Sequence, residues 1–361
     1  MKSNKFNILL RLLAACAAIC AALLLVYGNG ITFLNNSNPW GLIIIAAQCF
    51  VTAGCGTFFA VFLFYIFRAD NLKPTVNVCL HISLISSVLA FALLLLNAGR
   101  PFFAWYGMFS PAWGVGLLPT NAAVLGTYSM LVFFCFVLIM LFIERLNNYN
   151  SADIKNKPAL HPIKKFLWAF SAAAMFFAFF MYGSLGATLW QGLRPLPFVQ
   201  SLFACIAVGA LLLLLLPSLK ESSATVALIA KISFPIYFTF NLACLALMLF
   251  SNRDNIIFFA SAALEIILGI VSMLMLYKKH IQAGATLGLA AAAVEKLTPV
   301  MQTSLPVSPV ELIIAIGSAA FAVLAYDRLY KKSKGISNDT PLQQISDTGS
   351  TESTEQIEPI N

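Results

Sequence analysis

Long runs of apolar residues, separated by short polar segments, fill most of this 361-residue chain. A helix needs about 20 mostly apolar residues to cross the hydrocarbon core of a bilayer. The runs lack the strict alternation of membrane-barrel strands, so backbone hydrogen bonding in lipid requires helices. The pattern predicts an all-α polytopic membrane protein of about ten spans, at residues 9–28, 41–67, 75–97, 119–143, 165–190, 196–217, 225–250, 255–277, 281–300 and 308–330.

Two of these runs differ from the rest. The ninth is the weakest, because Glu295 and Lys296 lie near its end. The first has the basic flank and apolar core of a signal peptide, with Lys2, Lys5 and Arg11 near its start. No small-x-small cleavage site follows that core, so we expect it to be retained as the first helix.

Composition agrees with a membrane bundle. Hydrophobic residues make up 60% of the chain and charged residues 10%, with a mean hydropathy of +0.87. That leaves too little polar surface to cover a soluble globule. The segment 336–361 differs, because it is rich in Ser and Thr and contains five acids but no Lys or Arg. We expect a transmembrane bundle at 1–335 and a disordered, acidic cytoplasmic tail at 336–361.

Basic residues gather on one side of the predicted bundle. When alternate connections are grouped, 17 lie on the side of the N-terminus and four on the other side, at Arg100, Arg194, Arg253 and Lys296. Basic loops favour the cytoplasm, so both termini are predicted to be cytoplasmic, as an even number of spans requires. The formal net charge of +8 is then explained by inner loops beside anionic lipid, without a nucleic-acid partner.

Residues that bind redox metals are scarce. The eight cysteines all lie in apolar runs without a C-x-x-C pair, and we interpret them as buried apolar side chains. Of the three histidines, only His81 lies within a predicted span. We therefore expect neither haem nor an iron–sulfur cluster in this chain. Walker, nucleophile-elbow and H-E-x-x-H motifs are also absent from the sequence, so nothing indicates a soluble enzyme.

Three ionisable residues within the apolar runs are candidates for function, because charges at membrane depth are unfavourable. Glu265 lies near mid-membrane, where it is either a proton relay or ligand partner, or a neutral acid that joins helices. His81 and Lys231 each lie roughly 9 Å from the predicted cytoplasmic boundary, at 1.5 Å per residue. His81 either transfers protons or bonds a carbonyl, whereas Lys231 favours snorkelling to the interface. Together the three form a candidate proton path from the inside to the membrane centre.

Uncharged polar residues within the runs have two interpretations. The amide of Gln48, which enters from the outer side, can bond either a polar ligand head or another helix. Pro235 and Asn241 in the seventh run indicate a kinked helix, and we favour a structural role for the kink over a functional one.

The segment 96–114, LNAGRPFFAWYGMFSPAWG, supplies the first family signal. Its pattern L-N-A-G-R-P at 96–101, Trp105, and S-P-x-W at 110–113 resembles the NrfD-like family, the membrane subunits of polysulfide-reductase-type complexes. In that family the third span ends in L-D-x-G-R-P, followed by aromatics and an S-P-x-x-W-type motif. Asn97 stands here in place of the acid, which affects any proton exchange that the acid performs at the quinone site.

Other segments resemble the same family in the same order. GSLGATLWQGLRPLPFVQSLFA at 183–204 is similar to a segment of the ten-helix branch that serves hydrogenases and related complexes. LEIILG at 264–269 is similar to the E-x-x-x-G helix, and SLPVSPVELIIAIGSAAFAVLAY at 304–326 resembles the final span. The resemblance covers about residues 40–330.

The resemblance implies a membrane-anchor subunit that binds menaquinone or ubiquinone near the periplasmic face of a bacterial inner membrane. It implies electron exchange with a ferredoxin-like iron–sulfur subunit docked at that face. That subunit in turn serves a periplasmic catalytic subunit, often of the molybdopterin type. The chain itself would then contain no catalytic redox centre, and its motif-bearing loops would face the periplasm.

A quinone ring needs a flat apolar slot and a few hydrogen-bond donors for its carbonyl oxygens. Candidate quinone contacts are the donors Gln48 and Arg100, the family position Asn97, and three aromatic residues that would form walls, Trp105, Tyr106 and Trp113. The alternative interpretation is an interfacial aromatic belt beside a snorkelling Arg100.

Two other functions remain open from the sequence. A secondary transporter would explain Glu265 at mid-membrane and interrupted helices, although no repeated motif relates the two halves of the chain. A structural anchor with a degenerate quinone site would explain Asn97.

Overall fold

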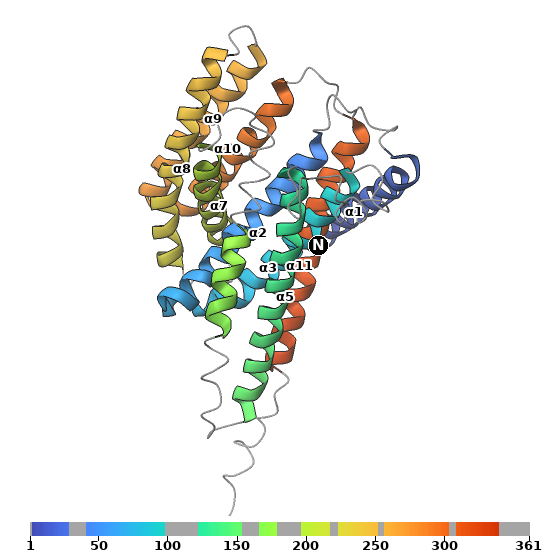
Figure 1. The fold of residues 1–361 in the computed structure, drawn as a ribbon, viewed down its shortest axis with the longest axis vertical. Helices are drawn as coiled ribbons and strands as arrows, with labels where there is room; N and C mark the ends of the chain where they lie inside the picture. Colours follow the sequence, from blue (N-terminus) through green and yellow to red (C-terminus); the bar gives the residue numbers. More distant parts are fainter. Residues whose placement is uncertain are drawn as a thin grey trace, which may run out of the picture.

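The computed structural model describes residues 2–28, 41–97, 122–153, 166–178, 196–216, 223–251, 256–302 and 308–338. Within these ranges the chain is helical, with short turns at some helix ends and no strand. The helices lie in a bundle, seen in Figure 1. The prediction of an all-α polytopic membrane protein is confirmed.

Each of the ten predicted spans corresponds to a helix in the described part of the chain. The helices are α1 (Lys2–Tyr27), α2 (Leu42–Phe67), α3 (Lys73–Asn97), α5 (Ala122–Asp153), the helix Phe166–Ala178, α7 (Leu196–Leu214), α8 (Ser223–Ser251), α9 (Ile256–Tyr277), α10 (Ile281–Gln302) and α11 (Pro309–Asn338). A single 3₁₀ turn, η2 (Asp70–Leu72), joins α2 to α3.

Two helices continue well past the C-terminal ends of the apolar runs that predicted them. α5 continues ten residues past 143, and α11 continues eight residues past 330. Hydrophobicity marks where a helix leaves the bilayer, whereas the backbone hydrogen bonds of a helix can continue into water. The expected tail from 336 therefore starts three residues inside α11, which ends at Asn338.

Seven of the helices described are long and apolar enough to cross a membrane: Lys5–Tyr27, Leu42–Phe67, Thr75–Asn97, Ser129–Leu146, Ala224–Ala243, Phe259–Tyr277 and Pro309–Leu329. Phe166–Ala178 and Gln200–Leu214 are shorter apolar helices. α10 contains the charged residues Glu295 and Lys296. The protein is a multi-pass integral membrane protein.

Lys296, counted above with the basic residues of the outer side, lies near the end of the ninth predicted span and not in a connection between helices. This residue lies within α10, where its ammonium pairs with Glu295 and its side chain is only 13% exposed. A charge neutralised inside the bundle says nothing about loop orientation. Removing it from the four outer residues leaves three, against 17 on the other side, so the basis of the predicted orientation becomes stronger.

The helices form two groups that meet along α2 and α7. α2 packs against α3, and α3 against α5, while α7 packs against α8 and α9 against α10. Figure 1 shows α8, α9 and α10 on one side of the bundle and α1 on the other. α1 and α11 pack together, and α11 also contacts α2 and α3. A continuous apolar core includes residues of both groups, among them Phe58, Phe133 and Phe234.

The contact between α2 and α7 is made by backbone. A Cβ atom at Gly209 would overlap the backbone of Gly56, and a Cβ atom at Gly56 would overlap the carbonyl oxygen of Cys205. Glycine permits helices in a membrane to approach this closely, so that many backbone atoms make van der Waals contact. The two halves of the bundle are therefore joined where neither helix has a side chain.

A side chain of α11 contacts the first turn of α2. Glu311 of α11 accepts a hydrogen bond from the backbone N–H of Leu42, at 3.3 Å, in the first turn of α2. A carboxylate at a helix N-terminus satisfies an otherwise unpaired N–H and interacts favourably with the helix dipole. Gly41 makes room for it, since a Cβ atom there would lie 2.5 Å from the Glu311 carboxylate.

Replacing Gly209 with Ala should destabilise the protein. Alanine favours a helix over glycine by up to about 1 kcal/mol, but overpacking of a close contact costs about 1–3 kcal/mol. We expect a lower melting temperature for Gly209→Ala in detergent, measured by the reaction of a thiol dye with the buried Cys55 and Cys205.

The matched control is Gly54→Ala on α2, where the added Cβ atom would lie 3.0 Å from the side chain of Ser86 on the neighbouring helix. Its destabilisation should be smaller than that of Gly209→Ala. Equal melting temperatures for the wild type and Gly209→Ala would contradict the backbone contact.

Candidate functional site

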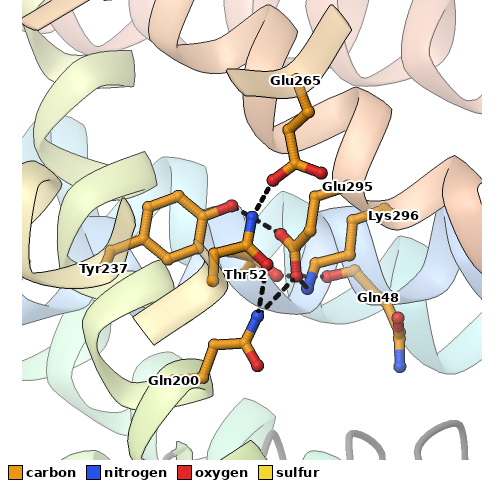
Figure 2. Close-up of polar contacts among 8 residues, drawn as sticks. Gln48, Thr52, Gln200, Tyr237, Glu265, Glu295 and Lys296 are labelled. Atoms are coloured by element: carbon orange, nitrogen blue, oxygen red, sulfur yellow. Dashed lines mark hydrogen bonds and ion pairs between the residues drawn. The ribbon is translucent and has the colours of Figure 1, made fainter. Parts of the chain in front are cut away.

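Six polar residues form a buried cluster inside the group α7, α8, α9 and α10. Figure 2 shows the side chains of the five cluster residues that it labels pointing toward one another. Five of the six are almost fully buried, with exposed fractions of 4% or less, and the ammonium of the sixth is mostly covered. The cluster comprises Gln200 of α7, Tyr237 and Asn241 of α8, Glu265 of α9, and Glu295 and Lys296 of α10.

Glu295 is the centre of this cluster. Its Oε1 accepts a hydrogen bond from Lys296 Nζ at 3.0 Å and another from Gln200 Nε2 at 3.2 Å. Its Oε2 accepts the hydroxyl of Tyr237 at 2.5 Å. Three donors, one of them cationic, are the surroundings that an ionised carboxylate requires when it is buried.

Glu265 is connected to Glu295 through two side-chain amides. Gln200 Nε2 also donates to Asn241 Oδ1 at 2.9 Å, and Asn241 Nδ2 donates to Glu265 Oε1. The second oxygen of Glu265 is buried and accepts no hydrogen bond from any residue that the structure describes. One carboxylate is therefore well solvated by protein donors, and the other is not.

The charges of the cluster do not balance if both acids are ionised. Two carboxylates and one ammonium leave one negative charge in a medium of low dielectric, which is strongly unfavourable. The hydrogen bonds divide the roles, because Glu295 has three donors and the cation whereas Glu265 has one neutral donor. The arrangement accordingly suits an ionised Glu295 and a proton on Glu265.

An apolar groove adjoins the cluster. It has a volume of about 630 Å³ and is lined by residues of α2, α7, α10 and α11. Glu295, Lys296 and Thr52 are its hydrogen-bonding side chains, and the remaining lining residues are apolar or cysteine. The charged cluster and the groove thus share one wall, formed by α10.

Gln48 lies next to this groove. It is buried on α2, one residue before the groove residue Cys49. Its backbone carbonyl accepts the Thr52 hydroxyl at 2.7 Å, and Figure 2 shows its side-chain amide pointing away from Glu295 and Lys296.

The other predicted quinone contacts lie at or beyond the end of α3. Asn97 is the last residue of α3, and its neighbours Leu93 and Leu96 pack with Ile43 near the start of α2. Asn97 is therefore at the same end of the bundle as Gln48. The remaining four lie outside the described residues, and their roles stay predictions: Arg100, Trp105, Tyr106 and Trp113.

The residues of the predicted proton path lie in separate places. His81 is buried on α3, its Nδ1 lies 2.6 Å from the carbonyl oxygen of Asn77, and it lines a cavity of about 460 Å³ with Arg145. Lys231 on α8 lies 6.0 Å from the ring centroid of Tyr277.

Lys231 is separated from the cluster along α8, where Tyr237 lies six residues further on, or about 9 Å at 1.5 Å per residue. Asn241, which contacts Glu265, is ten residues further along this helix, or about 15 Å at 1.5 Å per residue. Within the described ranges, no hydrogen bond or ion pair joins any two of His81, Lys231 and Glu265. A path through these three residues stays a prediction.

The sequence interpretation missed the partners of Glu265. The sequence interpretation linked Asn241 with Pro235 to a kink in the helix. In the structure α8 continues through Pro235, and the Asn241 amide bonds both Gln200 and Glu265. Tyr237 and Asn241 are four residues apart and so share a helix face, a signal that the sequence contained. Glu295 was treated only as a weakness of its span.

Comparison with known proteins finds a membrane protein that is similar to part of this chain. No family model matches the chain. The chain is similar to the protein named menaquinone reductase, integral membrane subunit, of Nitratidesulfovibrio vulgaris, with 27% identity over 165 residues. The match covers 45% of this chain and 38% of the relative, so the chain spans well under two thirds of that protein's length.

Removing the ammonium of Lys296 should strongly destabilise the protein. Lys296→Met leaves the Glu295 carboxylate buried without its cation, a change that typically costs about 3–5 kcal/mol. We expect a large fall in the melting temperature, or loss of folded protein from the membrane, by fluorescence-detected size exclusion.

The double variant Glu295→Gln with Lys296→Met provides the control. It removes both charges at once and should recover most of the lost stability, as replacement of a complete buried pair often does. A double variant less stable than Lys296→Met alone would show that the pairing is not what Lys296 contributes.

Proposed function

We propose that this chain is the quinol- or quinone-interacting membrane-anchor subunit of a bacterial respiratory oxidoreductase complex. The similarity to a menaquinone reductase membrane subunit is the observation that carries the proposal. The ordered motifs of residues 40–330 and the multi-pass helical bundle support it independently.

In this proposal menaquinone or ubiquinone binds at the end of the bundle where α2 begins and α3 ends. Gln48 and Asn97 lie at that end. The segment that follows α3 in the sequence contains the aromatic walls and the cation proposed for the quinone, Arg100, Trp105, Tyr106 and Trp113. The end in question faces the periplasm, with both termini in the cytoplasm, because basic residues favour the opposite side by 17 to three.

The partners in this proposal lie outside the membrane. A ferredoxin-like iron–sulfur subunit docks at the periplasmic end and exchanges electrons with the quinone, and a periplasmic catalytic subunit, often of the molybdopterin type, acts on the terminal substrate. This chain contributes the quinone site and the membrane anchor, and no redox centre of its own. The surrounding membrane is the bacterial inner membrane.

The charged cluster gives this subunit a means of handling protons. Oxidation of a quinol releases two protons for every two electrons. Glu265 carries a proton in this arrangement and Glu295 does not, so one acid can give up a proton and the other can accept one. Tyr237 contacts Glu295 directly and can exchange a proton with it, whereas Glu265 is reached through amides. Coupled proton movement through this region, with His81 and Lys231 nearer the other face, forms part of the proposal.

One observation favours a secondary transporter instead. Two buried carboxylates with a single ammonium also suit a site that takes up a proton or a cation during transport. In that case the protein would accumulate a solute in vesicles without a quinone or an iron–sulfur partner.

The first test is purification of the protein from its native membrane with the subunits that co-elute. We expect extractable quinone and an iron–sulfur subunit in the same peak. The signal of the reduced iron–sulfur cluster should appear when a short-chain quinol is added. A solitary protein without bound quinone, which instead accumulates a solute in vesicles, would refute the proposal.

Glu265→Gln should abolish proton coupling without affecting assembly. The amide keeps an oxygen that can accept the bond from Asn241 but cannot exchange a proton. Proteoliposomes of the purified complex, driven by a quinol and monitored with an internal pH dye, should show electron transfer without the proton signal.

Glu144→Gln is the matched control, because that carboxylate accepts a hydrogen bond from Tyr65 at 2.7 Å outside the cluster. It should leave the pH signal unchanged. A normal pH signal in Glu265→Gln would exclude Glu265 from the coupled proton movement.

A further inference from the structure

We propose that the groove between α2, α7, α10 and α11 binds the ring of an isoprenoid quinone against Lys296 and Glu295. This inference rests on the proposed function, since it names where in the described bundle the quinone binds. It differs from the sequence-based prediction, which gave the ring contacts to Arg100 and the aromatic residues after α3.

The shape of the groove suits a planar ring with an apolar tail. Seven of its 20 lining residues are alanines, whose short side chains leave space between the helices. Its volume of about 630 Å³ is within the range of pockets that hold small molecules and cofactors. The lining residues Ala293, Leu312, Ile316 and Ala319 are exposed on the outside of the bundle, so the groove opens sideways to lipid.

The polar wall of the groove suits the oxygens of both redox forms. The ammonium of Lys296 donates to Glu295, and an ammonium can also donate to a quinone carbonyl. The Glu295 carboxylate has about four lone-pair sites, and three donors occupy it. The remaining site can accept the hydroxyl of a quinol.

The depth of this wall favours a quinone over a phospholipid. Lys296 lies six residues before the end of α10, and Thr52 lies ten residues after the start of α2, or about 9 and 15 Å along the helices at 1.5 Å per residue. A phospholipid headgroup stays in the interfacial layer, which adds only about 5–8 Å on each side of the hydrocarbon core. A quinone ring, with two oxygens and no charge, can move below that layer.

The groove also places a ligand beside the proton-handling cluster. Glu295 lines the groove on one side and accepts the hydroxyl of Tyr237 on the other. A quinol oxygen at Lys296 would therefore be one carboxylate away from Tyr237 and, through Gln200 and Asn241, from Glu265.

The test uses the full-length protein, purified with the subunits that co-elute and reconstituted in nanodiscs. A decyl-tailed 1,4-naphthoquinone is titrated to measure its dissociation constant, and a version with a diazirine in the tail is photocrosslinked and mapped by mass spectrometry. We expect labels in residues 289–297 and 312–319, because these segments line the groove.

Two phenylalanine variants separate the groove from the rest of α10. Ala293→Phe fills the groove and should weaken naphthoquinone binding by about tenfold or more, as expected for loss of apolar contact and of one bond to a charged group. Ala283→Phe, at an exposed position near the other end of α10, should leave binding unchanged. Both variants keep the ion pair of Glu295 and Lys296, so the test avoids the loss of stability expected for Lys296→Met.

The outcomes distinguish this inference from the proposed function. Naphthoquinone that binds both variants equally, with labels outside the groove, would overturn the groove site and leave the proposed function intact. A wild-type complex that binds neither the naphthoquinone nor a decyl-tailed 1,4-benzoquinone would overturn both. Labelling of the groove by a photoreactive phosphatidylcholine that excess naphthoquinone cannot displace would identify it as a structural lipid site and overturn the inference.

Discussion

The buried ion pair of Glu295 and Lys296 is the constraint around which one half of this bundle is built. A carboxylate at this depth is tolerated only with several donors, and α7, α8 and α10 each supply one. The positions of Gln200 and Tyr237 therefore follow from the presence of one acid. Asn241 and Glu265 extend the same network to α9, so that four helices are joined by side chains whose separation would leave charges unpaired.

A second, simpler constraint joins the two halves. α2 and α7 meet at Gly56 and Gly209 without side chains, and this close approach determines where the groove lies relative to the charged cluster. Apolar packing alone would permit these helices to slide or rotate, because lipid is as apolar as their surfaces. The contact between two glycines is the specific feature that fixes their arrangement.

The sequence predicted the helices well and the site in part. Hydrophobic runs define spans because the bilayer sets their length, so all ten predicted runs correspond to helices in the described part of the chain. The ends of α5 and α11 were harder to predict, since helices continue into water. Glu265 was found because an acid in an apolar run is conspicuous, but its connection to Glu295 depends on which faces α8 and α10 present, and that follows only from packing. Lys296 counts with the outer basic residues in the sequence because its burial and its pairing with Glu295 follow only from the packing of α10.

The carboxylate of Glu311 beneath Leu42 has a consequence for assembly. α11 follows the other described helices in the sequence, yet it caps α2, packs against α1 and forms one side of the groove. α1 and α2 are therefore synthesised before the helix that covers part of their surfaces. The groove lacks one of its sides until α11 is in place, so synthesis of α11 and formation of the binding surface are coupled.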